Sequence, residues 1–152
     1  MERDKLNELY HETLLDHCRH PRNNTELDKP DIYGEAINPF CGDEVRIQLQ
    51  LSANDKVKTI GLQSEGCSIN IASGSMLTES IKNRPLVEIF AISQLFRASL
   101  GVDPISNSDN NRLGPLLSLQ GVKEFPVRIK CALLPWKGLE DAIENYIKLT
   151  KS

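Results

Sequence analysis

Strict alternation of apolar and polar side chains from Val45 to Leu51 is the feature that most constrains the fold. Successive side chains of a β-strand point to opposite faces of the sheet, so this pattern predicts a strand with one buried face. A turn at residues 52–55 separates it from a second alternating run at residues 57–63. Two such runs joined by a short turn predict an antiparallel hairpin.

Helical patterns surround this hairpin. Residues 4–19 carry apolar side chains at three- and four-residue spacing, and Pro21 ends the pattern because it disfavours helical geometry in the residue before it. A strand-to-helix switch follows Gly66, with Cys67 or Ser68 as the N-cap. The small residues 72–75 are expected to let this helix lie close to the sheet. This helix is predicted to run to about Lys82. Further helices are predicted from Pro85 onward, at residues 113–119, and after residue 126 with Pro135 as a break or restart.

The 152 residues are enough for one domain, so we expect a single α+β domain over residues 1–152, a small antiparallel sheet with helices packed on it. The polar stretch at residues 101–111 is predicted to be rich in turns. A net charge of −3 and an aromatic content of 5% argue against nucleic-acid binding. The sequence has no apolar run long enough for a membrane span and no secretory leader, which favours a cytoplasmic protein.

Four cysteines carry the possible chemistry, Cys18, Cys41, Cys67 and Cys131. In the cytoplasm they are expected to be reduced, so either metal or thiol chemistry, or ordinary burial, explains them. Cys41 precedes the first strand of the hairpin and Cys67 follows the second. Both thiols therefore belong at the same end of the sheet.

Asp43 lies two residues after Cys41 and can turn toward the same point. Together with Cys67 and Cys131 it would give three sulfur ligands and one oxygen ligand, a set that suits tetrahedral zinc. Arg128 and Lys130 stand beside Cys131 and could neutralise so negative a site. The spacings match no short zinc motif, and from the residues alone buried inert cysteines remain an equal alternative.

Other conspicuous residues favour plainer roles. Cys18 lies on the apolar face of the first helix, where inert packing is expected. His17 and His20 lack carboxylate partners at metal-site spacing, so a solvated or capping role is predicted for both. Trp136 is expected to be a core residue rather than part of a docking surface.

Four motifs together resemble the U-type iron–sulfur cluster assembly family, which includes IscU scaffolds, NifU N-terminal domains and SufU. They cover nearly the whole chain in the right order. The motifs are His-Pro-Arg-Asn at residues 20–23, Asn-Pro-Phe-Cys-Gly-Asp at 38–43, Gly-Cys-Ser-Ile at 66–69 and Arg-Ile-Lys-Cys at 128–131.

Two departures from the IscU pattern make the chain more similar to SufU. Lys130 stands where IscU scaffolds carry a histidine, and the segment between Cys67 and Cys131 is longer. The resemblance implies a zinc site made by Cys41, Asp43, Cys67 and Cys131. It also implies that Cys41, accompanied by Arg128, accepts sulfur from a cysteine desulfurase of the SufS type. The chain would then act as a zinc-dependent sulfurtransferase that passes sulfur on to downstream cluster-assembly scaffold proteins. We expect it to be a monomer.

Three other functions stay open. The chain could be a scaffold that holds an iron–sulfur cluster on Cys41, Cys67 and Cys131 and transfers it to other proteins. It could also be a structural zinc domain that docks onto partners. An electron-transfer protein is less favoured, because an aspartate ligand would make the cluster labile.

Overall fold

A three-stranded antiparallel sheet of order β1-β2-β3 forms the base of the computed structural model, which describes residues 2–39, 42–101 and 113–150. Its strands are β1 (Ile32–Asn38), β2 (Asp43–Leu51) and β3 (Val57–Glu65). The predicted hairpin is confirmed as β2 and β3, with Ile47 opposite Leu62. Val45, Ile47 and Leu49 are buried, as the alternation requires.

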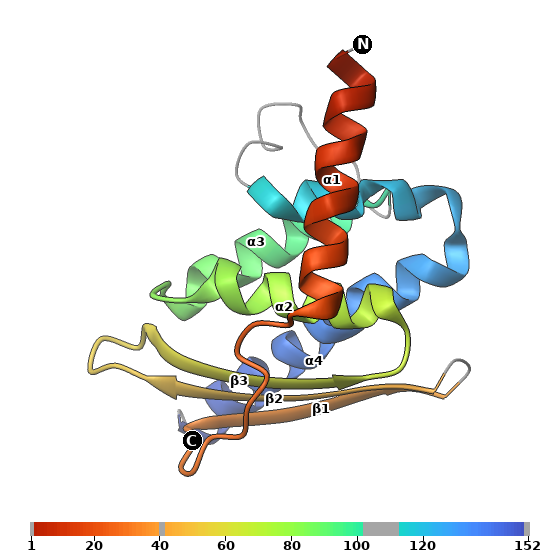
Figure 1. Ribbon diagram of the computed structural model, residues 1–152. Coiled ribbons are helices and arrows are strands. Elements are labelled where there is room, and N and C mark those ends of the chain that lie inside the picture. Colours follow the sequence, from red (N-terminus) through yellow and green to blue (C-terminus); the bar gives the residue numbers. More distant parts are fainter. Residues whose placement is uncertain (1, 40–41, 102–112, 151–152) are drawn as a thin grey trace.

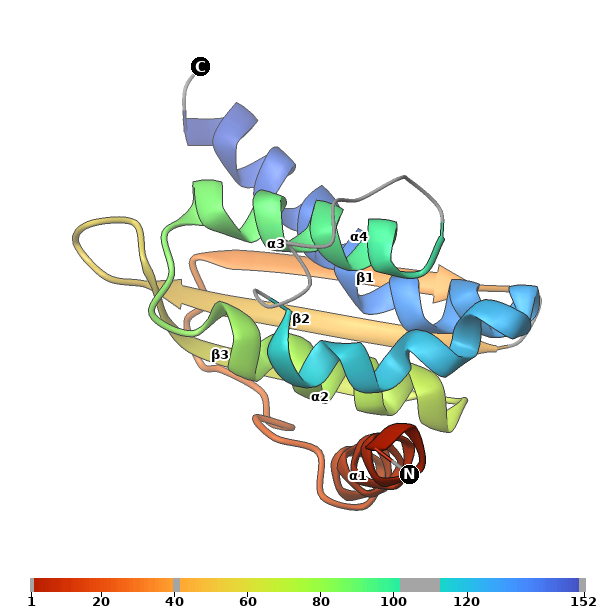
Figure 2. The same cartoon turned by 90° about the horizontal axis from the view of Figure 1, so that it is seen from above.

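The helices gather on one face of this sheet (Figures 1 and 2). Helix α4 lies over β1 and β2, helix α2 lies over β3, and α1 packs against α2 and η2. This layering confirms the predicted α+β class. No helix in the described ranges is both long and apolar enough to cross a bilayer. The helices are α1 (Glu2–Arg19), α2 (Ser68–Ile81), α3 (Leu86–Ser99), the 3-10 helix η2 (Gly114–Glu124) and α4 (Pro126–Thr150).

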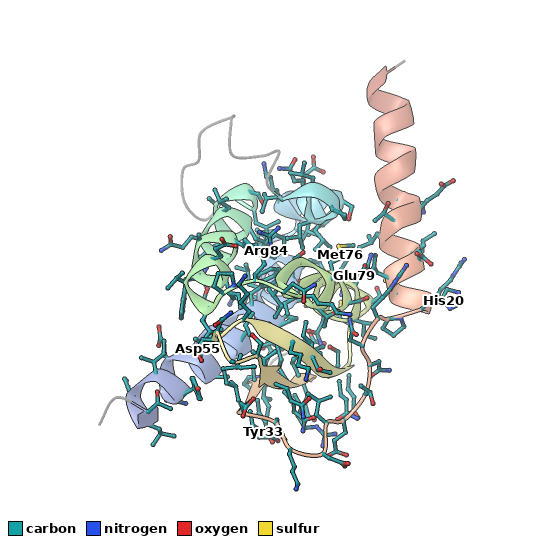
Figure 3. All side chains as sticks on the ribbon, turned by 90° about the vertical axis from the view of Figure 1, so that its left-hand side faces the viewer. His20, Tyr33, Asp55, Met76, Glu79 and Arg84 are labelled. Carbon is teal, nitrogen blue, oxygen red and sulfur yellow. The ribbon has the colours of Figure 1, made fainter. Side chains whose placement is uncertain are left out.

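Strand β1 was not among the predicted elements. Its residues facing α4 are small, and Gly34 and Ala36 gave no apolar signal. Tyr33 lies on the opposite, outer side of the sheet and is half exposed (Figure 3). The predicted segment at 113–119 is a 3-10 helix rather than an α-helix, and the predicted turn-rich stretch at 101–111 lies, apart from Gly101, outside the described residues.

The prediction of a break at Pro135 is wrong, because α4 continues through it. Proline in a helix interior costs about 3 kcal/mol, through a lost N–H donor and a clash with the preceding turn. Burial of Trp136 and Leu139, which follow Pro135, offsets this cost, at about 1.5–3 kcal/mol for each large apolar side chain. Trp136 is confirmed as a core residue and lies against Phe96, with ring centroids 5.2 Å apart.

Small residues allow both helices to approach the sheet closely. A Cβ atom on Gly74 of α2 would lie 2.8 Å from Leu62 Cδ2 of β3, which confirms the expected role of the small run 72–75. On the other side, a Cβ atom on Gly34 of β1 would lie 2.5 Å from Ala142 Cβ of α4. The separation between α4 and β1 is therefore set by glycine.

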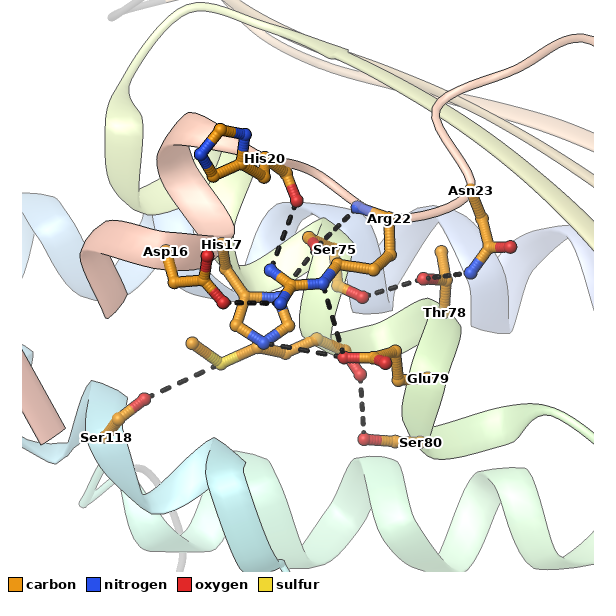
Figure 4. A network of polar contacts seen from close by, with 11 residues as sticks. Asp16, His17, His20, Arg22, Asn23, Ser75, Thr78, Glu79, Ser80 and Ser118 are labelled. Carbon is orange, nitrogen blue, oxygen red and sulfur yellow. Dashed lines mark hydrogen bonds and ion pairs between the residues drawn. The ribbon is translucent and has the colours of Figure 1, made fainter. Parts of the chain in front are cut away.

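His17 joins α1 to α2 and corrects the prediction of a solvated histidine (Figure 4). It is 5% exposed, and its Nδ1 atom lies 2.7 Å from Ser75 Oγ. Its Nε2 atom lies 3.5 Å from the Glu79 carboxylate, and the Arg22 amide donates to the same Ser75 oxygen. Burial, with a smaller contribution from Arg22, lowers the pKa of His17, while Glu79 and Asp16 oppose that shift. His20, by contrast, is exposed at the end of α1, as expected (Figure 3).

Gly34→Ala tests the contact between α4 and β1. The added methyl group would meet Ala142 Cβ and the Gly138 carbonyl oxygen, which are 2.5 and 3.1 Å from its position. We expect the free energy of unfolding to fall by about 1–3 kcal/mol, as for other overpacked sites. Gly121→Ala is the control, because nothing lies within 4 Å of a Cβ atom there. Equal urea denaturation midpoints for the two variants would contradict this account.

His17→Gln tests the buried histidine through pH. The folded protein binds a proton at His17 less readily than the unfolded chain does, because its pKa is lowered. The free energy of unfolding should therefore fall as pH drops from about 7.5 to about 5.5, and His17→Gln should reduce that fall. His11→Gln, on the exposed side of the same helix, should leave the fall unchanged. Urea titrations of each protein at both pH values give the free energies of unfolding. An equal change in this free energy between the two pH values for wild type and His17→Gln would refute the assignment.

Candidate functional site

Two of the predicted ligands, Asp43 and Cys67, are in contact at one end of the hairpin. Strand β2 begins at Asp43 and β3 ends at Glu65, with Glu44 paired to Glu65 in the register. Asp43 and Cys67 therefore lie at the same end of the sheet, the end where Cys67 was predicted to lie together with Cys41. Cys41, the predicted sulfur acceptor, lies outside the described residues.

Asp43 is fully buried at 0% exposure. Its Oδ1 atom accepts a hydrogen bond from the backbone N–H of Cys67 at 2.7 Å. Gly66 makes this contact possible, because its φ of +113° favours glycine and a Cβ atom there would collide with the Asp43 carboxylate. The carboxylate and the start of α2 are thus fixed to each other.

Cys67 is the N-cap of α2, with extended backbone angles and no side-chain capping bond. Its sulfur instead accepts a hydrogen bond from Arg128 Nη1 at 2.6 Å. The Cys67 sulfur raises the pKa of Arg128 above its ordinary value, and Cys131 adds a smaller contribution in the same direction. Arg128, predicted as a supporting cation, therefore faces both sulfurs.

Cys131 occupies the turn of α4 that follows Arg128 and is 1% exposed. Its sulfur lies 3.7 Å from the Val127 carbonyl oxygen, one helical turn earlier. Within the described part of the chain, no three His, Cys, Asp or Glu side chains are grouped closely enough to hold a metal ion. A four-ligand set requires Cys41, so the ligand assignment stays a prediction.

Cys18 is a neighbour of this site that sequence reasoning did not find. It packs against the edge of the core, as predicted, but its thiol also contacts the Ser68 carbonyl oxygen at 3.2 Å. Burial raises the pKa of Cys18, and the nearby Cys67 raises it further. Nothing in the sequence pattern links the end of α1 to the start of α2, so no local signal could have revealed this pair.

The surface around the site combines apolar and basic side chains. Phe125 and Val127, at the start of α4, are 59% and 69% exposed. A groove of about 590 Å³ is lined by residues of α4 and by the end of β1, with Pro39, Lys130 and Lys137 among them. A second hollow of about 650 Å³, around the C-terminal end of α2, is lined by none of the predicted ligands.

Comparison with known proteins agrees with the resemblance seen in the sequence. Residues 9–132 match the family described as the NifU-like N terminal domain. The zinc-dependent sulfurtransferase SufU of Bacillus subtilis is 38% identical over 91% of each chain. The iron–sulfur cluster assembly scaffold protein IscU of Streptococcus pyogenes is 34% identical over 93% of this chain and 86% of its own length.

A solved structure supports the same assignment. The iron–sulfur cluster assembly scaffold protein for the SUF system from Fervidobacterium islandicum superimposes with a TM-score of 0.79 and 28% identity. The alignment covers 86% of this chain and 93% of that one. On the sequence match, the relatives and the shared fold, the chain belongs to the NifU-like N-terminal domain family, which includes proteins of the SufU and IscU types.

Proposed function

We propose that this protein is a zinc-bound sulfur acceptor in iron–sulfur cluster assembly, acting with a cysteine desulfurase of the SufS type in the cytoplasm. The observation that carries the proposal is the hydrogen bond from the Arg128 guanidinium to the Cys67 sulfur. The backbone N–H of the same cysteine binds the buried Asp43 carboxylate. The 38% identity to a zinc-dependent sulfurtransferase, and Lys130 in the place of a possible histidine ligand, favour sulfur transfer over a scaffold role.

Cys41, Asp43, Cys67 and Cys131 are the residues that would hold the zinc. The donor types fit the ion, because zinc accepts thiolate and carboxylate ligands. The burial of Asp43 also fits, since a carboxylate removed from water needs hydrogen bonds, a cation or a metal beside it. Zinc bound there would keep Cys41 deprotonated at neutral pH, the form in which a cysteine attacks another sulfur.

In the proposed transfer, the Cys41 thiolate attacks the outer sulfur of a persulfide on the desulfurase. A new sulfur–sulfur bond forms at Cys41, the bond within the donor persulfide breaks, and the donor cysteine leaves as a thiolate. Arg128 supplies positive charge beside the sulfurs while this exchange takes place. The persulfide on Cys41 is then the sulfur source for a downstream cluster-assembly scaffold.

The exposed surface is suited to such a partner. Phe125 and Val127 offer apolar contact area at the start of α4, and Lys130 adds positive charge nearby. Exposed apolar side chains grouped beside a reactive site are typical of a protein interface. A desulfurase bound there would bring its persulfide to the end of the hairpin.

The second candidate is a scaffold for an iron–sulfur cluster, and the identity of 34% to IscU favours it. A cluster would use Cys41, Cys67 and Cys131. Metal analysis of the purified protein separates these functions, because a cluster absorbs visible light and zinc does not. A structural zinc domain would bind zinc as well, but it would carry no persulfide.

Cys41→Ser tests the acceptor. After incubation with a SufS-type desulfurase and cysteine, mass spectrometry should detect an added mass of about 32 Da, one sulfur, on the wild-type protein. The adduct should be lost in Cys41→Ser and kept in Cys18→Ser, the matched control. Zinc content measured on each variant separates loss of the acceptor from loss of the metal. An adduct of normal yield on Cys41→Ser would disprove the assignment.

Arg128→Gln tests the cation at the sulfurs. Removing a charged partner next to metal ligands typically weakens metal binding about 10- to 100-fold, and we expect a loss in this range. Lys130→Gln is the matched control, because it removes the same charge two residues away on the same helix. Competition with a zinc chelator at constant pH gives both affinities. Equal affinities for the two variants would mean that direct contact with Cys67 contributes nothing.

A further inference from the structure

Cys18 is a thiol that the proposed transfer does not use. It lies in the last turn of α1, and its side chain is half-buried. Its sulfur contacts the carbonyl oxygen of Ser68 at 3.2 Å. Ser68 is the first residue of α2 and directly follows Cys67, so Cys18 lies at the start of the helix that Cys67 caps.

Burial raises the pKa of Cys18, and the charge of Cys67 raises it further. Both are partly accessible, whereas Cys131 is buried. A small oxidant in solution can therefore reach these two sulfurs more easily than the third described cysteine.

Further contacts hold Cys18 in this place. The neighbouring His17 binds Ser75 on α2 through a buried hydrogen bond of 2.7 Å, which fixes the end of α1 along α2 (Figure 4). Asn23, just beyond the helix, bonds to Thr78 of α2 at 2.9 Å. The approach of Cys18 to the start of α2 is thus part of the helix packing and does not depend on a single exposed side chain.

We propose that Cys18 and Cys67 form a redox site, in which a hydroperoxide oxidises the two thiols to a reversible disulfide that withdraws Cys67 from metal binding. The formation of this bond is independent of the sulfur-transfer function. Its consequence for the metal rests on the proposed zinc site.

The chemistry balances with one hydrogen peroxide molecule. The Cys67 sulfur, beside the Arg128 guanidinium, attacks one peroxide oxygen, and the oxygen–oxygen bond breaks. This step yields a sulfenic acid on Cys67 and, after proton transfer, one water. The Cys18 sulfur then attacks the Cys67 sulfur, a sulfur–sulfur bond forms, and the hydroxyl group leaves as a second water. Two thiols are oxidised and one peroxide is reduced.

Such a bond would disable the site without destroying it. A sulfur in a disulfide no longer binds zinc as a thiolate, so the metal would be held by fewer ligands and would dissociate faster. Because a thiol reductant reverses a disulfide by exchange, the metal site would be recoverable. Cys18 would thereby also protect Cys67 from the irreversible sulfinic and sulfonic acids.

The test uses the metal-loaded protein and hydrogen peroxide at roughly one equivalent. After alkylation of the remaining thiols, non-reducing digestion and mass spectrometry should identify a Cys18–Cys67 peptide pair. A chromogenic chelator should record zinc release in parallel. We expect Cys18→Ser and Cys18→Ala to lack the bond and to release zinc at least about threefold more slowly. Dithiothreitol followed by zinc should restore full metal content in the wild type, because the reductant reverses the disulfide.

Two results would overturn the proposal. One is Cys18 recovered fully alkylated while zinc leaves the wild type and Cys18→Ser at the same rate. The other is Cys67 paired with Cys41 or Cys131 instead. Zinc content measured before oxidation keeps the two hypotheses apart. A protein that holds no zinc but forms the Cys18–Cys67 bond would refute the proposed metal site and leave the redox site standing.

Discussion

The hydrogen bond from the Cys67 amide to the Asp43 carboxylate determines the geometry of the whole site. It joins the first residue of β2 to the N-terminus of α2, where backbone N–H groups lack helical partners and a negative charge is favoured. Gly66 lets the two groups approach, since any other residue would place a Cβ atom on the carboxylate. The entry of the chain into α2, and with it the position of the Cys67 sulfur, follows from this contact.

The close approach of helices to the sheet completes the site from the other side. Gly74 lets α2 lie on β3, and Gly34 lets α4 lie on β1. As a result, the first turns of α4 reach the N-terminus of α2. Arg128 there contacts the Cys67 sulfur, and Ser73 of α2 donates to the Ala132 carbonyl, the residue after Cys131. Gly34 and Gly74 thus take no part in the chemistry, but the close packing that they allow brings Arg128 to the Cys67 sulfur.

Features that depend on local periodicity, such as the hairpin, were predicted from the sequence. Features that depend on packing between distant segments, such as strand β1 and the burial of His17, were not. The alternation in β2 and β3 predicted Cys41 and Cys67 at one end of the hairpin, and the structure places Cys67 there beside Asp43. Strand β1 escaped prediction because Gly34, which faces α4, must be small and so carries no apolar signal. His17 was predicted to be solvated, since the Ser75 hydroxyl that makes its burial tolerable lies far away in the sequence.

The charges at the site bear on the choice between zinc and a cluster. The proposed ligand set of three thiolates and one carboxylate would carry four negative charges, and a divalent ion would leave two of them uncompensated. Arg128 lies against the Cys67 sulfur and would offset one of these charges. Lys130 is exposed, and its ammonium group has donors but no lone pair for a metal, so it can add charge but no ligand. A histidine at that position would offer a ring nitrogen to a cluster. Lysine at residue 130 therefore adds a positive charge where a histidine would add a ligand. This difference favours the proposed sulfur transfer over a scaffold role.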